Sequence, residues 1–260
     1  MRVVPVPCLS DNYAYLVVTG PGGPVAIVDP SEPGPVVRAL EALDLRPTAI
    51  WNTHHHFDHT GGNEELAKRY GIEWVSGHAS DRGRIPRQTK FLEAGETFDF
   101  GGATVKILHI PGHTLGAVAY VVRAPGDVDA TLFTGDTMFH AGCGRLFEGT
   151  PAQMTASLAS LVAEGDGARV YPGHEYTVQN LRFARSVEPG NRDVDAALAH
   201  AEELRGRGEA TVGTNIALER ATNPFLRTSS RQIRETLGID AAADDASALA
   251  KVREAKNSFK

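Results

Sequence analysis

The sequence predicts an α/β protein whose larger N-terminal part combines strands with helices and whose C-terminal part is a small helical domain. Short apolar runs bounded by Gly, Pro or Asp recur as far as Thr134 and are typical of strands. Helical patterns separate some of these runs. Beyond about residue 175 the chain is rich in Ala, Glu, Arg and Leu and mostly shows helical spacing. We therefore expect two domains, residues 1–174 and residues 175–260.

Each expected element rests on a local pattern. Apolar runs predict strands at Val3–Pro7, Tyr13–Thr19, Val25–Asp29, Thr48–Thr53, Val105–Ile110, Ala117–Val122, Thr131–Thr134 and Arg169–Tyr171. Helical spacing predicts helices at Pro35–Leu43, Asn63–Tyr70, Pro151–Ala163, Asp193–Arg205, Arg231–Leu237 and Ala246–Phe259. Proline suits the start of a helix because the first helical N–H has no partner within the helix. Strands and helices that alternate in this way predict stacked α and β layers.

Length and composition exclude several classes of protein. The chain has 260 residues, of which 42% are hydrophobic and 22% charged, as in an ordinary globular protein that can bury a sizeable core. Lys and Arg number 26 against 32 Asp and Glu, so the formal charge is 26 − 32 = −6. An acidic chain offers no overall electrostatic attraction to nucleic acid or to an anionic membrane, and we expect neither partner.

Cysteine content and the N-terminal sequence indicate the compartment. The two cysteines, Cys8 and Cys143, cannot form the disulfide framework of a small secreted domain, which favours a reducing environment. No apolar run approaches the roughly 18 residues of a membrane span. The N-terminal apolar residues are interrupted by Pro5, Pro7 and Asp11, so they do not resemble a signal peptide. We expect a cytoplasmic protein.

The strongest chemical signal is the segment His54-His55-His56-Phe57-Asp58-His59, which follows an expected strand and precedes Gly61-Gly62. In a strand-to-helix loop, His54 and His56 can point to one position while Asp58 and His59 turn toward a second. Imidazole nitrogens and carboxylate oxygens suit zinc, iron or manganese. The absence of a Cys-x-x-Cys pair disfavours a thiolate zinc site. This loop therefore predicts a metal site, with ligands for two ions.

Three more candidate ligands follow strand-like runs: His113, Asp136 and His174. Each lies beside a glycine, which permits a tight turn and close approach of the backbone. Loops at the ends of neighbouring strands can converge on one place. Taken singly, each residue is more simply explained as part of a turn or of the core. Taken jointly with the histidine-rich loop, they predict a set of five histidines and two aspartates.

These motifs resemble those of a known superfamily. His54–Asn63, Gly112-His113-Thr114, Gly135-Asp136-Thr137 and Gly173-His174 are similar, in order, to the motifs of the metallo-β-lactamase superfamily, whose fold is an αββα sandwich with a dinuclear site at one edge. A second set of segments resembles the glyoxalase II family within it: Ala141–Thr150, Gly173–Thr177, Val187–Asn191, Asn223–Arg227 and Arg253–Phe259. The similarity extends over nearly the whole chain.

The resemblance implies a role for each matching residue. It places His54, His56 and His113 on one ion, Asp58, His59 and His174 on the other, and Asp136 on both. It implies two divalent ions, with zinc expected and iron or manganese as alternatives. Asp58 and Asp136 would take part in catalysis, and glutathione would contact Arg145, Tyr176, Arg253, Lys256 and the backbone of Phe147.

Two of these positions depart from many relatives. Arg145 stands where Lys is common, and Phe147 stands where Tyr is common. The arginine keeps the positive charge with a different hydrogen-bond geometry, while the phenylalanine has no hydroxyl. The departure at Phe147 therefore bears on affinity for the thiol part of the substrate.

The reaction implied by the resemblance is hydrolysis of S-2-hydroxyacylglutathione, typically S-D-lactoylglutathione, in methylglyoxal detoxification. Water between two cations is acidified to hydroxide near neutral pH and can attack the thioester carbonyl. The thiolate that leaves has a conjugate-acid pKa of about 8.5 and needs little help from a general acid. We expect a monomer that acts on a small-molecule glutathione thioester.

Two other functions are compatible with parts of the pattern. One is a mononuclear iron persulfide dioxygenase acting on glutathione persulfide, which metal stoichiometry and oxygen consumption would distinguish. The other is a metal-bearing binding module, which would bind ligand tightly without turnover. The full set of seven ligands and the helical C-terminal segment favour the hydrolase. A nuclease is disfavoured because the acidic chain lacks a basic, aromatic platform.

Overall fold

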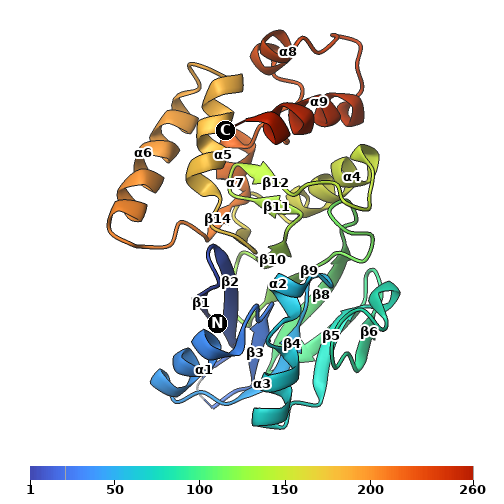
Figure 1. The fold of residues 1–260 in the computed structure, drawn as a ribbon, viewed down its shortest axis with the longest axis vertical. Helices are drawn as coiled ribbons and strands as arrows, with labels where there is room; N and C mark the ends of the chain where they lie inside the picture. The colour runs from blue at the N-terminus through green and yellow to red at the C-terminus, as the bar shows by residue number, and fades with distance from the viewer. Residues whose placement is uncertain (21, 260) are drawn as a thin grey trace. The chain divides into compact units, whose positions relative to one another are not determined.

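The computed structural model describes residues 1–20 and 22–259 (Figure 1). The chain divides into two compact units. The first comprises residues 1–109 and 116–135, and the second comprises residues 110–115 and the chain from Asp136 onward. This division differs from a single boundary near residue 175, which stays a prediction. Each unit is described in turn.

The first unit contains two groups of hydrogen-bonded strands. One sheet has the order β1 (Arg2–Cys8), β2 (Asn12–Val18), β3 (Val25–Val28), β4 (Pro47–Trp51), β5 (Trp74–His78) and β6 (Lys90–Leu92). Its first three strands are antiparallel and β3 to β6 are parallel. The other group is antiparallel, with β7 (Thr97–Phe100), β8 (Ala103–His109), β9 (Val118–Arg123) and β10 (Thr131–Gly135) in adjacent positions.

Helices cover one face of the first sheet. Apolar side chains of α1 (Pro33–Ala42) and α3 (Asn63–Tyr70), such as Leu40 and Leu66, pack in one cluster with Leu16 and Ile50 of the strands. Pro33 suits the first turn of α1, and α3 ends at a glycine in the left-handed conformation. Figure 1 shows α1 and α3 beside strands β3 and β4.

Aromatic side chains hold the two strand groups of the first unit face to face. The ring of Trp51 in β4 stacks on that of Tyr120 in β9, with centroids 5.1 Å apart and an interplanar angle of 10°. Tyr15 in β2 contacts Phe133 in β10, with centroids 5.6 Å apart. These large rings are fully buried and contribute strongly to the core. The first unit is therefore a helix layer on two stacked strand layers.

The second unit is mainly helical. It contains the hairpin of β11 (Met138–Phe139) and β12 (Gly142–Cys143), and the antiparallel pair of β13 (Arg169–Pro172) and β14 (Thr214–Asn215). Its helices are α4 (Pro151–Val162), α5 (Thr177–Val187), α6 (Arg192–Gly206), α7 (Ile216–Thr222), α8 (Arg231–Leu237) and α9 (Asp245–Ser258). Leu181 of α5 packs with Val194 and Leu198 of α6.

Most expected elements occur within a few residues of their predicted bounds, but several were missed. The structure adds β5, β6, β7, α5 and α7 to those that the local pattern indicated, together with the two-residue strands β11, β12 and β14, the one-turn helix Phe57–Thr60 and the 3-10 turn Ala79–Asp81. Helix α5 contains Thr177, Val178 and Asn180, residue types with weak helix propensity, and its packing against α6 stabilises it instead. In the described residues, no helix combines the length and apolar character needed to cross a bilayer.

Candidate metal centre and substrate pocket

The first unit carries a cluster of imidazoles in the loop after β4. Nε2 of His54 lies 3.1 Å from Nδ1 of His56. Two nitrogen ligands of a tetrahedral zinc ion are separated by about 3.3 Å, given Zn–N bonds of roughly 2.0 to 2.1 Å. The pair is therefore spaced as ligands of a common ion. The loop is anchored by Asn52, whose Nδ2 donates to the carbonyl oxygen of His59 at 3.0 Å.

Asp29, at the end of β3, organises this loop. Its Oδ1 accepts a hydrogen bond from the backbone N–H of Thr53 at 2.8 Å, and its Oδ2 accepts from the Thr53 hydroxyl at 2.6 Å. Because that hydroxyl gives its only hydrogen to the carboxylate, it accepts from Nδ1 of His54, which lies 3.0 Å away. Nε2 of His54 is then left with the lone pair that a metal ligand needs.

The same carboxylate fixes a second histidine. Oδ2 of Asp29 lies 3.0 Å from Nδ1 of His59, and both side chains are buried. A carboxylate can only accept, so the ring hydrogen is on Nδ1 and Nε2 carries the lone pair. Asp29 was not among the residues predicted from the sequence. The only hint in the sequence is that an Asp follows directly after the apolar strand Val25–Val28. The left-handed backbone of Asp29 is visible only in the structure.

Asp58 lies beside His59 on the one-turn helix α2 (Phe57–Thr60). Its Oδ2 is 3.7 Å from Nε2 of His59 and accepts a hydrogen bond from Nδ2 of Asn12 at 3.1 Å. The first unit thus brings His54 and His56 together, and Asp58 and His59 together, as the spacing predicted. By contrast, Nδ1 of His55 points to the buried carboxylate of Asp81 at 3.1 Å.

The second unit brings the other three candidate ligands together. Oδ2 of Asp136 lies 3.5 Å from Nε2 of His113 and 3.3 Å from Nε2 of His174. All three side chains are buried. Nδ1 of His113 lies 2.9 Å from the backbone carbonyl of Arg145, to which it donates its hydrogen, so Nε2 faces Asp136 with its lone pair. One carboxylate oxygen of Asp136 therefore lies close to both imidazoles.

The donor groups of each unit are of the kinds that bind divalent ions. The first unit offers imidazoles and one carboxylate, and the second offers the carboxylate of Asp136 between two imidazoles. Neutral nitrogen and anionic oxygen donors of this kind suit zinc, iron and manganese. Burial raises the pKa of the Cys143 thiol to about 11, and the nearby Arg253 lowers it only in part. Cys143 therefore stays protonated at neutral pH, which argues against a role as ligand or nucleophile.

The expected substrate-binding residues lie in the second unit, and three of them share a cavity. A cavity of ≈ 490 Å³ is lined by Arg145, Phe147 and Arg253, together with residues of α9. Phe147 is 63% exposed, and the centroid of its ring lies 5.2 Å from that of the His113 ring. Arg253 is buried, and its Nη1 donates to the carbonyl oxygen of Cys143 at 2.7 Å. Burial lowers the pKa of Arg253.

The other two expected substrate residues are not among those that line this cavity. The amine of Lys256 donates to the carbonyl oxygen of Gln179 at 3.3 Å and lies 5.5 Å from the centroids of Phe183 and Phe259. Burial, with the charge of Arg253, lowers the pKa of Lys256 to about 8. Tyr176 stacks on His174, with centroids 4.7 Å apart and an interplanar angle of 6°. It therefore contacts a candidate ligand directly.

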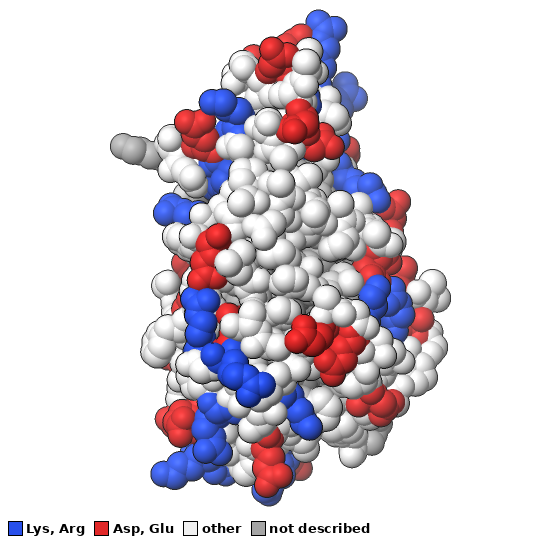
Figure 2. Space-filling view, turned by 90° about the vertical axis from the view of Figure 1, so that its right-hand side faces the viewer, with Lys and Arg blue, Asp and Glu red and all other residues white. Residues whose placement is uncertain are grey.

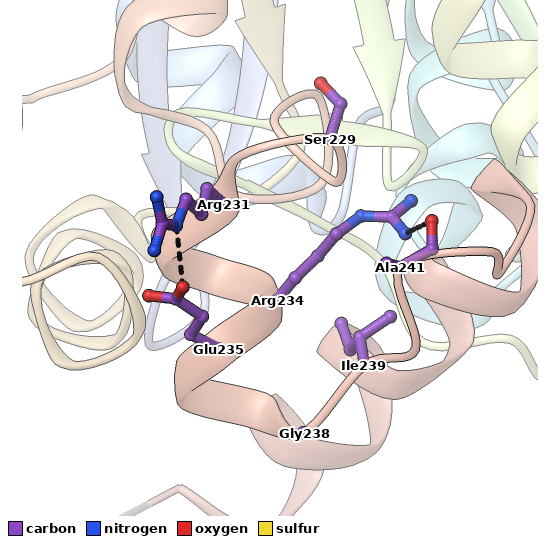
Figure 3. Close-up of a pocket in the computed structure, with 7 residues that line it drawn as sticks. All are labelled: Ser229, Arg231, Arg234, Glu235, Gly238, Ile239 and Ala241. Carbon is purple, nitrogen blue, oxygen red and sulfur yellow. Dashed lines mark hydrogen bonds and ion pairs between the residues drawn. The ribbon is translucent and has the colours of Figure 1, made fainter.

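A larger hollow of ≈ 690 Å³ lies beside α8 and is shown in Figure 3. Its lining includes the ion pair of Arg231 and Glu235, with 2.7 Å between Nε and Oε1. The guanidinium of Arg234 donates to backbone carbonyls, including those of Thr228 at 2.8 Å and Ala243 at 3.0 Å, so it holds the chain around α8. No expected site residue lines this hollow.

On the face drawn in Figure 2, Lys and Arg form a run in the lower left part, with Asp and Glu beside it. The middle of this face is largely uncharged.

Comparison with known proteins places the chain in a family. Residues 10–174 match the model of the metallo-beta-lactamase superfamily, and residues 175–259 match that of the hydroxyacylglutathione hydrolase C-terminus. A hydroxyacylglutathione hydrolase of Synechococcus sp. (strain JA-2-3B'a(2-13)) is 45% identical over 259 residues, 100% of both chains. Another from Maricaulis maris (strain MCS10) is 44% identical over 253 residues, 97% of this chain and 96% of the relative.

Solved structures agree on the fold. The BLEG-1 B3 metallo-beta-lactamase has a TM-score of 0.64 and 21% identity, covering 86% of this chain and 99% of its own. TTHA1623, solved in a di-iron-bound form, has a TM-score of 0.58 and 28% identity, covering 87% of this chain and 100% of its own. These comparisons confirm the predicted fold class, a metallo-β-lactamase fold with a helical C-terminal region. The chain belongs to the hydroxyacylglutathione hydrolase, or glyoxalase II, family of the metallo-β-lactamase superfamily.

Proposed function

We propose that the protein is a metal-dependent hydrolase that cleaves S-2-hydroxyacylglutathione, typically S-D-lactoylglutathione, to the 2-hydroxy acid and glutathione. The observation that carries the proposal is the continuous family relationship. Models of the superfamily and of the hydrolase C-terminus together span residues 10–259, and full-length relatives named hydroxyacylglutathione hydrolase are 41–46% identical. The presence of all seven expected metal ligands supports it.

We also propose the assignment of those ligands. His54, His56 and His113 would hold one ion, Asp58, His59 and His174 the other, and Asp136 both. When bound, such a pair of ions supplies hydroxide from water near neutral pH. Zinc suits these donors, and the di-iron form of TTHA1623 supports iron as an alternative. The hydrogen bonds of Asp29, of the Thr53 hydroxyl and of the Arg145 carbonyl support the proposal because they engage Nδ1 of three histidines and so place the ring lone pair on Nε2.

The chain's own residues would then carry out substrate binding and orientation. Glutathione has two carboxylates, which in an acidic protein need a local cationic pocket. Arg145 and Arg253 line one cavity and supply such charge, with Lys256 nearby on α9 and Tyr176 beside His174. Addition of hydroxide to the thioester carbon followed by cleavage of the C–S bond releases the thiolate of glutathione. Asp58 would orient the attacking oxygen through its carboxylate.

The decisive experiment assays hydrolysis of S-D-lactoylglutathione beside elemental analysis of the same sample. His54→Ala and Asp136→Ala should lose bound metal and activity together, because each removes a ligand. His200→Ala, which removes an exposed histidine of α6, is the matched control and should retain both. A folded, metal-loaded wild type that leaves the thioester intact would contradict the proposed function.

The alternative function, a persulfide dioxygenase, is not better supported than the hydrolase. The structure of ETHE1 from Myxococcus xanthus covers 98% of this chain with a TM-score of 0.64, but at 24% identity it establishes only the shared fold. Oxygen consumption with glutathione persulfide would identify that activity. We further propose a cytoplasmic monomer, which cell fractionation and sedimentation can test.

A further inference from the structure

The hairpin of β11 and β12 lies immediately after Asp136 in the chain. Its strands share two residue pairs, Met138 with Cys143 and Phe139 with Gly142. An isolated hairpin of this size is not stable in water, so other parts of the unit must hold it. Ala141 near its tip has a φ of 54°, which is unfavourable for a residue with a side chain. The hairpin therefore depends on contacts from its surroundings.

Helix α7 supplies the central contacts. Asn223, at the C-terminal end of α7, donates from Nδ2 to the carbonyl oxygen of Gly142 at 3.0 Å. The same amide nitrogen lies 2.9 Å from Oε2 of Glu219, which accepts from the backbone N–H of Ala141 at 2.9 Å. Asn223 and Glu219 are both 0% exposed. Hydrogen bonds in such a buried network are costly to lose, because water cannot replace the missing partner.

Two other helices hold the remaining backbone groups. Nδ2 of Asn180 in α5 donates to the carbonyl oxygen of His140 at 3.1 Å, and Arg253 in α9 donates to that of Cys143. Buried side chains from α5, α7 and α9 thus bind four consecutive residues, from His140 to Cys143. The position of the hairpin is set by the helices.

The two residues that directly follow the hairpin, Gly144 and Arg145, lie against two of the expected metal ligands. At Gly144, directly after β12, a Cβ atom would collide with the carbonyl oxygen of Asp136 and lie 3.0 Å from Nδ1 of His113. The next residue, Arg145, accepts the hydrogen bond from Nδ1 of His113 through its carbonyl oxygen. A shift of the hairpin would therefore move the backbone of Asp136 and the hydrogen-bond acceptor of His113 together.

We propose that Asn223 is a positioning residue for the metal site: by holding the hairpin, it orients Asp136 and His113 for binding the ions. The inference rests on the proposed function, since it takes these two residues as ligands. It adds a role for the helical C-terminal region, which would maintain the metal site as well as bind substrate.

The test measures metal loss from the full-length, metal-loaded enzyme to an excess of chelator. Asn223→Ala should release metal about 10-fold faster than wild type, in the range found when residues that orient metal ligands are changed. Added metal should restore much of its kcat, whereas its KM for the thioester should change little. Asn180→Ala provides a second, milder variant of the same contact network. If Asn223→Ala does not fold, faster metal loss from Asn180→Ala still supports the inference and an unchanged rate overturns it.

Asn215→Ala is the matched control. Asn215 caps the other end of α7, accepting from the N–H of Leu218 at 2.9 Å, and it makes no hydrogen bond to the hairpin in the described structure. Its loss should lower the melting temperature and leave the rate of metal release unchanged. Equal rates for Asn223→Ala and wild type, or equally fast release from Asn215→Ala, would overturn the inference. A wild type that binds no metal would instead refute the proposed function.

Discussion

Asp29 and His59 form a buried pair in which Oδ2 of the carboxylate lies 3.0 Å from Nδ1 of the imidazole. The same oxygen accepts the hydroxyl hydrogen of Thr53, and that hydroxyl lies 3.0 Å from Nδ1 of His54. One carboxylate therefore fixes the hydrogen positions of two histidines. The relationship places the lone pair of both rings on Nε2, the atom through which the proposed ligands would bind metal.

Asp29→Asn should weaken metal binding by about 10- to 100-fold, the usual cost of removing a carboxylate that orients a ligand histidine. The amide of Asn is nearly isosteric with the carboxylate, but its nitrogen donates hydrogen bonds and does not accept them. It cannot replace both oxygens that receive the hydrogens of Thr53 and His59. Competition with a chromogenic chelator measures the affinity. Asp44→Asn is the control, because Asp44 has a similar left-handed backbone, with φ of 50° against 48° for Asp29, and is exposed. Equal affinities for the two variants would contradict this role of Asp29.

Lys256 should give the pH profile of kcat/KM a decline above about pH 8. Burial lowers the pKa of its amine to about 8, so the free enzyme loses this positive charge as the pH rises through that value. The substrate carboxylates would then bind less well, and kcat/KM reports groups of the free enzyme. Lys256→Arg, which stays charged, should remove the decline. Lys251→Arg changes an exposed lysine of the same helix and should keep it; identical profiles for Lys256→Arg and wild type would exclude this assignment.

Phe147→Tyr should lower KM for the glutathione thioester by about 2- to 10-fold, the value of one added hydrogen bond of roughly 0.5 to 1.5 kcal/mol. The ring lines the cavity with Arg145 and Arg253 and is 63% exposed, so a hydroxyl can be added without a steric clash in the core. Steady-state kinetics at several substrate concentrations separates KM from kcat, which should stay within about twofold. An unchanged KM would show that the tyrosine common at this position is not needed for binding.

The ionised carboxylate of Glu188 should stabilise the fold at pH values above the ordinary pKa of glutamate. This stabilisation should be lost in acid. Burial opposes its ionisation, but hydrogen bonds from Arg227, Ser230 and Asn191 outweigh burial and lower its pKa below 4.5. The stabilisation is therefore complete above about pH 4.5 and disappears as the pH falls through the lower folded-state pKa. Arg227→Ala should cost roughly 2 kcal/mol at pH 7, because it removes two 2.7 Å hydrogen bonds to the partly buried, charged carboxylate.

Urea unfolding at several pH values measures this effect. The difference in unfolding free energy between wild type and Arg227→Ala should shrink below about pH 4.5, as Glu188 becomes protonated. Arg207→Ala removes the exposed partner of Glu209 and should change stability little at any pH, since surface pairs are screened by solvent. If Arg227→Ala lowered the unfolding free energy by the same amount at every pH, an ion pair between Arg227 and ionised Glu188 would be contradicted.

Local patterns in the sequence were enough to predict several strands, the pairing of residues in the histidine-rich loop and the fold class. Short apolar runs located β2 and β9, because a run of this length between turn residues is typical of a buried strand, and all but the last residue of each strand is buried. The spacing of the histidine-rich loop placed His54 with His56 and Asp58 with His59, since neighbours in a short loop remain neighbours in space. The family motifs indicated the fold class and the superfamily.

Tertiary structure decided the contacts that join distant parts of the chain. Asp29 meets Thr53 across 24 positions, and Arg253 meets the carbonyl of Cys143 across 110. Neither pairing leaves a periodic signal, because each depends on how the elements pack and not on the neighbours of either residue. The same reason explains why helix α5 was missed, since packing against α6 stabilises it. It also explains why the sequence marked Asn223 only as part of a family motif and did not reveal its hydrogen bond to Gly142.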